Sequence, residues 1–181
     1  MEEQARKTGI DVIGAVPWGT HLCLFYGTKQ ELFDILVPYF KAGLESNESC
    51  IWVTSESLSE KEAEEALRQA VSDFARYLER GQMEIISGAE LYLKDGGFSM
   101  QRVLDGWIDR LNQALSRGFE GMRVTGDMAW LEKVDWPDFI DYEEEVNNII
   151  GDYQMLAVCT YPLDKCGVSE VMDVMGSHGY A

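Results

Sequence analysis

Five short apolar segments alternate with longer amphipathic segments along this chain. The short segments contain few polar residues, which is typical of strands that are buried on both faces of a sheet. They lie at residues 22–26, 49–54, 83–87, 122–125 and 155–161. This alternation predicts an α/β fold with three layers, in which crossover helices cover both faces of a mainly parallel sheet.

The segments between the strands have apolar residues at helical spacing. The predicted helices span residues 29–44, 60–70, 71–80, 98–117, 137–150 and 168–175. Pro38 removes one backbone hydrogen bond inside the first of them, so we expect a kink or a break there. Residues 88–98 contain an Asp-Gly-Gly turn signal and are expected to form a loop with Tyr92 in its middle.

We expect a single domain, because a chain of 181 residues is long enough to build one core. Residues 1–20 are interpreted as a lead-in segment, with a loop and a short helix over 8–20, and residues 21–181 as the domain itself. The four cysteines are scattered and form no C-x-x-C pair, as reduced thiols of a cytoplasmic protein would be. The sequence shows no apolar run long enough to span a membrane and no basic leader, so no membrane partner is predicted.

The charge balance argues against direct binding of nucleic acid. Lysine and arginine number 15 against 32 aspartates and glutamates, which gives a net charge of −17. Such a surface repels a phosphate backbone, and no stripe of basic residues interrupts it. If the protein regulates transcription, another module has to contact the DNA.

The turn after the first predicted strand lies where a nucleotide-binding protein of this class has its phosphate loop. That loop needs two glycines with four residues between them, then Lys and Ser or Thr, so that backbone N–H groups surround the phosphates. Here the chain reads GTKQE from Gly27 to Glu31. The second glycine is missing, and Glu31 brings negative charge to the helix N-terminus. Residues 14–20 fit part of the glycine spacing of a phosphate loop, but they precede the first predicted strand instead of following it. We therefore predict that triphosphate binding has been lost.

The first third of the chain resembles the core of RecA-like ATPases, particularly their circadian-clock (KaiC-like) branch. The resemblance is carried by the run TGIDVIGAVPWGTHLCLFYGTKQELFDILVPYFKAGLESNESCIWVTSE. In active members an acidic pair follows the second strand, and here Glu56 is followed by Ser57. Asp127 falls where the family's magnesium-organising acid would lie.

A closer resemblance, to the MEDS sensory domain, covers essentially the whole chain. It rests on HLCLFYGTKQELFDILVPYFKAGLE, CIWVTSE, YLERGQMEII, LYLKDGGFSMQRVLDGWIDRLNQAL, WLEKVDWPDFIDYEEEVNNIIGDYQMLAVCTYPLDKC and the late His178. The resemblance implies a non-catalytic sensor of small carbon compounds whose signalling partner is a histidine kinase or regulator module. It leaves open whether the chain forms a homo-oligomer.

Ligands of open parallel sheets bind beyond the carboxyl ends of the strands. We expect a ligand site there, since the residues at these ends combine aromatic rings and hydroxyls with a few charges, which suits a small, partly apolar or cationic ligand. The predicted ligand-binding residues are Tyr26, Gly27, Thr28, Lys29, Ser55, Glu56, Glu90, Tyr92, Asp127, Trp130 and Tyr161. Such residues also serve as helix caps and core side chains, and a Lys in the first turn of a helix is more often a solvated charge.

An alternative site combines thiols and imidazoles. If the first and fifth strands are neighbours, a metal or thiol-sensing site could assemble from His21, Cys23, Cys159, Cys166 and His178. Their spacing matches no zinc signature, and a buried Cys usually acts as a small apolar residue. The sequence therefore favours a site without metal and a domain without cofactor.

Covalent catalysis is not predicted either. No orienting acid is recognisable for a histidine beside a Ser or Cys nucleophile. The acidic run at 141–145 is interpreted as the solvated face of a helix. The favoured function is a non-catalytic sensory domain for signal transduction or transcriptional regulation, which recognises a one-carbon or hydrocarbon-derived compound. The alternatives are a degenerate ATPase using Lys29, Glu56 and Asp127, and a self-associating scaffold.

Overall fold

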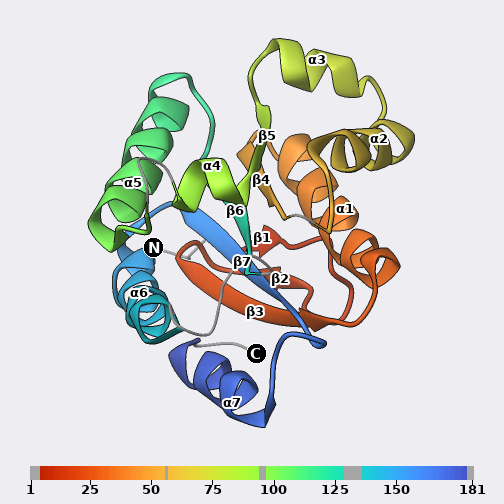
Figure 1. The fold of residues 1–181 in the computed structure, drawn as a ribbon. Coiled ribbons are helices and arrows are strands. Elements are labelled where there is room, and N and C mark those ends of the chain that lie inside the picture. Colours follow the sequence, from red (N-terminus) through yellow and green to blue (C-terminus); the bar gives the residue numbers. More distant parts are fainter. Residues whose placement is uncertain (1–4, 56, 94–96, 129–135, 179–181) are drawn as a thin grey trace.

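The computed structural model describes residues 5–55, 57–93, 97–128 and 136–178. Its centre is a sheet of five strands in the order β3-β7-β6-β4-β5, with every neighbouring pair parallel. The strands are β3 (Thr20–Tyr26), β4 (Ser49–Thr54), β5 (Met83–Ser87), β6 (Met122–Asp127) and β7 (Met155–Pro162). Helices cover both faces (Figure 1), so the predicted three-layer α/β/α fold is confirmed.

Seven α-helices and one 3₁₀ helix are formed by the described residues. They are α1 (Lys29–Glu45), α2 (Glu60–Ala70), α3 (Phe74–Glu79), α4 (Gly88–Tyr92), α5 (Met100–Ser116), α6 (Trp136–Ile149), η3 (Ile150–Asp152) and α7 (Val168–Ser177). No membrane-spanning candidate is found in the described ranges, because none of their helices combines the necessary length and apolar composition.

The structure differs from three local expectations. α1 has no break at Pro38, because apolar residues on both sides of the proline, Leu36 and Tyr39 among them, are buried against the sheet. The predicted loop at 88–98 begins with α4, whose N-cap Ser87 accepts a hydrogen bond from the Glu90 N–H. In place of a helix in the lead-in segment, β1 (Arg6–Lys7) pairs antiparallel with β2 (Ala15–Val16).

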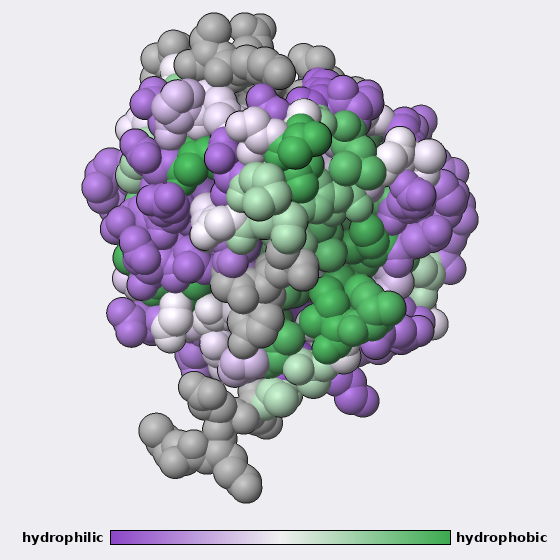
Figure 2. All heavy atoms as spheres, turned by 90° about the horizontal axis from the view of Figure 1, so that it is seen from below, coloured by the Kyte–Doolittle hydropathy of each residue, from purple (hydrophilic) through white to green (hydrophobic). Residues whose placement is uncertain are grey.

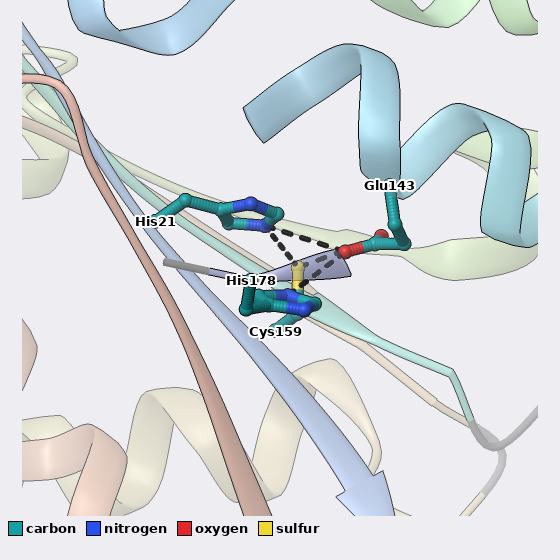
Figure 3. A group of neighbouring side chains, drawn as sticks. All are labelled: His21, Glu143, Cys159 and His178. Atoms are coloured by element: carbon teal, nitrogen blue, oxygen red, sulfur yellow. Dashed lines mark hydrogen bonds and ion pairs between the residues drawn. The ribbon is translucent and has the colours of Figure 1, made fainter. Parts of the chain in front are cut away.

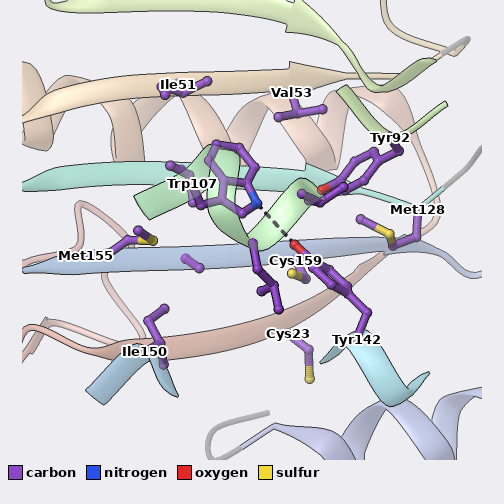
Figure 4. Close-up of a cluster of buried hydrophobic side chains, with 14 of the residues drawn as sticks. Cys23, Ile51, Val53, Tyr92, Trp107, Met128, Tyr142, Ile150, Met155 and Cys159 are labelled. Atoms are coloured by element: carbon purple, nitrogen blue, oxygen red, sulfur yellow. Dashed lines mark hydrogen bonds between the residues drawn. The ribbon is translucent and has the colours of Figure 1, made fainter. Parts of the chain in front are cut away.

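The sheet separates two apolar cores. One lies under α1, α2 and α3 and contains Phe40 and Trp52. The other lies under α5, α6 and α7 and contains Trp107 and Tyr142 (Figure 4). Because successive side chains of a strand point to opposite faces, Leu22 of β3 belongs to the first core, whereas its neighbour Cys23 belongs to the second.

Candidate functional site

The loop after β3 uses its backbone donors within the protein. The N–H groups of Gly27 and Thr28 donate to Glu31 Oε2 at 2.7 and 2.9 Å, and Thr28 Oγ1 accepts from the Glu31 N–H at 3.2 Å. These bonds lower the pKa of the Glu31 carboxyl. The capping box therefore puts a carboxylate where a phosphate would lie in a P-loop. Lys29 is 43% exposed, and its Nζ lies 2.8 Å from Glu62 Oε1.

At the carboxyl ends of β3, β6 and β7, polar side chains converge but bond to one another. Tyr26 Oη donates to Asp127 Oδ2 at 2.8 Å, and Thr160 Oγ1 lies 3.4 Å from the same oxygen. Burial, followed by the nearby Asp127 carboxylate, raises the pKa of Tyr26. Tyr26 and Asp127 are both buried.

The other predicted ligand residues are dispersed. Ser55 contacts Ser57, with their hydroxyl oxygens 2.9 Å apart, and Glu90 is exposed on α4. The side chains of Tyr92 and Tyr161 are buried in the core under α5 and α6. Glu56 and Trp130 lie outside the described residues. The ligand role of this set stays a prediction.

A different group of side chains does come together, between the sheet and α6. His21 of β3, Cys159 of β7, Glu143 of α6 and His178 directly after α7 point toward one another (Figure 3). All four are buried, and one donor atom from each lies within 4.8 Å of the other three. His21 Nε2 is 3.3 Å from both Cys159 Sγ and Glu143 Oε2, and His178 Nε2 is 3.0 Å from Glu143 Oε2.

The strand register brings the first two residues together. β3 and β7 are neighbours, with His21 opposite Ala157 and Cys23 opposite Cys159. Alternate residues share a face of the sheet, so His21 and Cys159 both face α6. Of the five residues in the predicted Cys/His site, His21, Cys159 and His178 belong to this cluster, whereas Cys23 and Cys166 do not.

Glu143 was missed because it lies in an acidic run that was interpreted as solvated. Its exposed fraction is 0%, so that interpretation is wrong at this position. The spacing of the buried residues could have indicated that Glu143 is buried. Glu143 follows Phe139 by four residues and Tyr142 by one, and both of these are buried on the same helix. The expectation that neither histidine has an acid partner is also wrong, because Glu143 is close to both.

The cluster combines one carboxylate with two imidazoles and one thiol. Burial by itself would raise the pKa of Glu143, but the imidazoles of His178 and His21 hold it at about 2. Burial lowers the pKa of His21 and raises that of the Cys159 thiol. His178 Nδ1 lies 2.8 Å from the Val174 carbonyl oxygen, to which it can only donate, so Nε2 bears the lone pair in the neutral ring.

This geometry does not suit a nucleophile, base and acid triad. In a triad the base contacts the nucleophile through one ring nitrogen and the acid through the other. Here Nε2 of His21 faces both Cys159 and Glu143, and Nδ1 has no hydrogen-bond partner among the described residues. The donor atoms converge on one point instead of forming a chain.

A cavity of about 30 Å³ borders the cluster on the side of α5. Aromatic rings form much of its wall, and Trp107 Nε1 donates to Tyr142 Oη at 3.1 Å beside it (Figure 4). The lining residues are His21, Tyr92, Trp107, Val124, Thr125, Gly126, Tyr142, Glu143, Val146, Met155, Ala157 and Cys159. A Cβ atom at Gly126 would lie 2.8 Å from Tyr92 Oη, so glycine allows the tyrosine to approach the strand.

Comparison with solved structures supports the fold. A KaiC-like protein of Pyrococcus horikoshii OT3 is 16% identical, with a TM-score of 0.61, over 97% of this chain and 77% of that one. The flagellar accessory protein FlaH of Methanocaldococcus jannaschii is 14% identical, also with a TM-score of 0.61, over 98% of this chain and 78% of that one. At such identity the similarity establishes a RecA/KaiC-like fold.

Sequence comparison identifies the family. The transcriptional repressor DcmR of Methylorubrum extorquens (strain DSM 6343 / CIP 106787 / DM4) is 24% identical over 166 residues, which are 90% of this chain and 59% of the repressor. The chain therefore spans less than two thirds of that relative. The family model described as MEthanogen/methylotroph, DcmR Sensory domain matches residues 20–179. The chain belongs to the MEDS family of sensory domains.

Proposed function

We propose that this domain senses a one-carbon or hydrocarbon-derived compound and binds it in the cavity beside His21, Glu143 and Cys159. The observation that carries the proposal is the cavity itself, a small space with an aromatic wall on which three polar side chains converge. About 10–15 Å³ is enough for one water molecule, so a volume of about 30 Å³ suits a molecule of very few atoms.

Two larger depressions are less suitable for such a ligand. They measure about 680 and 600 Å³ and lie beside α2. Both are more open to solvent than the cavity beside the cluster, and Glu65 lines both of them. The larger one is lined mainly by charged side chains, and the other by equal numbers of polar and apolar residues. A small apolar ligand gains most where it leaves water completely. This requirement favours the cavity beside the cluster, which is the least open of the three.

The same contacts argue against the ATPase alternative. Two backbone N–H groups that could bind phosphate already donate to Glu31, and Lys29 forms an ion pair with Glu62. Asp127, the candidate magnesium ligand, accepts a hydrogen bond from buried Tyr26. Nucleotide binding would have to break these interactions. We therefore propose a non-catalytic domain that acts in the cytoplasm with a signalling partner, as the name of its repressor relative suggests.

Thermal unfolding with small ligands tests the proposal. At a ceiling of about 1.5 kcal/mol per non-hydrogen atom, a ligand of two such atoms has a Kd no lower than about 6 mM, and a ligand of three has a Kd no lower than about 0.5 mM. At ten times Kd it should stabilise the domain by about 1.4 kcal/mol and raise Tm by roughly 3–5 °C. We expect this shift with methanol, methylamine or dichloromethane, and none with 1-butanol or Mg-ATP.

Filling the cavity provides the control. Ala157→Val adds two methyl groups to the cavity wall and should abolish the ligand shift. Ala15→Val makes the same change at an exposed position of β2 and should keep it. A shift of equal size in Ala157→Val would contradict the proposed location, and stabilisation by Mg-ATP would support the ATPase.

A second candidate function, self-association, is favoured by the exposed side of α7. Val168, Met172 and Met175 are 83%, 62% and 47% exposed, and Leu163 is 51% exposed. Figure 2, which views the molecule from below, shows apolar side chains gathered on this face. Exposed apolar patches of this kind often mark protein contacts, and a second copy of the chain would bury the patch.

Met172→Glu tests this candidate by placing a charge within the patch. We expect the substitution to abolish concentration-dependent dimerisation in analytical ultracentrifugation. The unfolding free energy should change by no more than about 0.5 kcal/mol, since the side chain is exposed. Glu144→Gln, on an exposed position of α6, is the control and should dimerise as the parent does. A parent chain that stays monomeric at every concentration would remove the candidate.

A further inference from the structure

We propose that His21, Glu143, Cys159 and His178 bind one divalent transition-metal ion, with Zn²⁺ as the best-suited ion. The residues border the cavity of the proposed ligand site, but metal binding needs no organic ligand and can be tested without one. Imidazole nitrogen, carboxylate oxygen and thiolate sulfur are the three donor types that zinc accepts in proteins.

The distances fit a single ion. Bonds of about 2.0–2.1 Å to nitrogen or oxygen and about 2.3 Å to sulfur place the donors of a tetrahedral site roughly 3.3–3.6 Å apart. His21 Nε2 lies 3.3 Å from Cys159 Sγ and 3.3 Å from Glu143 Oε2, and His178 Nε2 lies 3.0 Å from the same oxygen. The remaining separations are no more than 4.8 Å. Shifts of a few tenths of an ångström to about one ångström would complete the shell.

Hydrogen bonds within the cluster leave two of its atoms unsatisfied: His21 Nε2 and Cys159 Sγ lie 3.3 Å apart, and the Cys159 thiol donates to Glu143 Oε1 at 3.7 Å. Glu143 Oε2 and His178 Nε2 are both buried, and neither has a hydrogen-bond partner of acceptable geometry among the described residues. The Nδ1–H of His178 donates to the Val174 carbonyl, so the neutral form of the ring directs its Nε2 lone pair at a carboxylate oxygen. In that form a metal ion between the two atoms would accept both lone pairs. A backbone acceptor on the far nitrogen is also the usual support of a metal-binding histidine.

The charges also fit. In the described part of the chain, the ion pairs of Glu143 involve the two histidines and no lysine or arginine. When both imidazoles are neutral the buried carboxylate has no compensating cation, which is costly. On metal binding the Cys159 thiol would release its proton to solvent, and thiolate and carboxylate together would carry a charge of −2. A divalent ion neutralises that charge, whereas a monovalent ion leaves it half compensated.

Such an ion would connect four segments that are distant in sequence. Its ligands come from β3, α6, β7 and the residue after α7. Four protein donors complete a tetrahedral shell, which is typical of a structural zinc ion. The metal would therefore hold the C-terminal helix against the sheet beside the cavity.

The test is metal analysis of protein purified without a metal-affinity step. We expect about one Zn²⁺ per chain after incubation with zinc and gel filtration, and a Tm about 10 °C higher than in chelator-treated protein. The Co²⁺ form should show a thiolate-to-cobalt charge-transfer band in the near ultraviolet. Glu143→Gln should weaken the affinity by at least the 10- to 100-fold that loss of an outer-shell partner costs.

Two cysteine variants complete the test. Cys159→Ser should lose the charge-transfer band, while Cys166→Ser, outside the cluster, should keep it. If Cys159→Ser does not fold, His178→Gln near the end of the chain takes its place and should lose stoichiometric metal. Less than about 0.1 equivalent of metal in the parent, or an unchanged band in Cys159→Ser, would overturn the proposal. Repeating the small-ligand series with zinc-loaded and chelated protein separates this proposal from the sensory one, because metal content is measured without ligand.

Discussion

Replacement of Arg123 by methionine should lower the free energy of unfolding by about 3–5 kcal/mol, the cost of leaving a buried charge without its partner. Arg123 Nε lies 2.7 Å from Glu48 Oε2, and both side chains are 0% exposed. The other carboxylate oxygen of Glu48 is held by Arg6 at 2.8 Å. One cation would remain in the variant, which places the expected loss toward the lower end of the range.

The guanidinium of Arg123 also satisfies backbone acceptors. It donates to the carbonyl oxygens of Tyr39, Thr8 and Lys7 at 2.7, 3.1 and 2.9 Å. Methionine can replace the volume of the side chain but none of these bonds. The lead-in segment should therefore loosen along with the core, because two of the three acceptors belong to it.

Urea unfolding measures the effect. Arg68→Met is the matched control, since Arg68 is 47% exposed and pairs with Glu64 on the surface of α2. It should change stability by less than about 0.5 kcal/mol. Adding Glu48→Leu to Arg123→Met should recover part of the loss, because a buried ion pair can often be exchanged for apolar residues. A loss below about 1 kcal/mol in Arg123→Met would show that this network does not stabilise the fold.

The strands were predictable because each is an uninterrupted apolar run between turns. Trp52 within β4 and Trp107 on α5 were expected in the core, and both are buried. The order of the strands was not predictable from local pattern alone, because nothing in 20–26 indicates that β7 is its neighbour. The cluster depends on that order, since His21 and Cys159 are separated by 138 positions in the chain.

Two residues with polar groups, Glu143 and Tyr92, were misplaced in the sequence analysis, and both are buried. Glu143 lies on the apolar stripe of α6, but the acids around it suggested a solvated face. Tyr92 precedes the Asp-Gly-Gly turn signal at 95–97, yet α4 directs its ring into the core. In both cases tertiary burial overrides a local composition signal. A polar residue at the spacing of an apolar stripe is therefore a better indicator of a site than the composition of its neighbours.

Trp52→Ala should cost about 3–5 kcal/mol of unfolding free energy, since it removes a large buried side chain and leaves a cavity. Trp52 is 0% exposed. Its ring stacks on Phe40 with centroids 5.1 Å apart and meets the edge of Phe33 at 6.4 Å. Thermal and urea unfolding measure the loss, with Val12→Ala at a 94% exposed position as the control.

The same variant tests whether the two faces of the sheet act independently. Trp52 belongs to the core under α1 and α2, whereas Cys159 and Glu143 lie on the opposite side with α6. Folded Trp52→Ala should therefore bind metal with the parent's stoichiometry, although it unfolds at a lower temperature. If metal content fell in proportion to stability while the protein remained folded, the sheet would be transmitting strain between its faces. The cluster would then have to be treated as one unit with the α1 core, because its donor atoms would depend on packing that they do not contact.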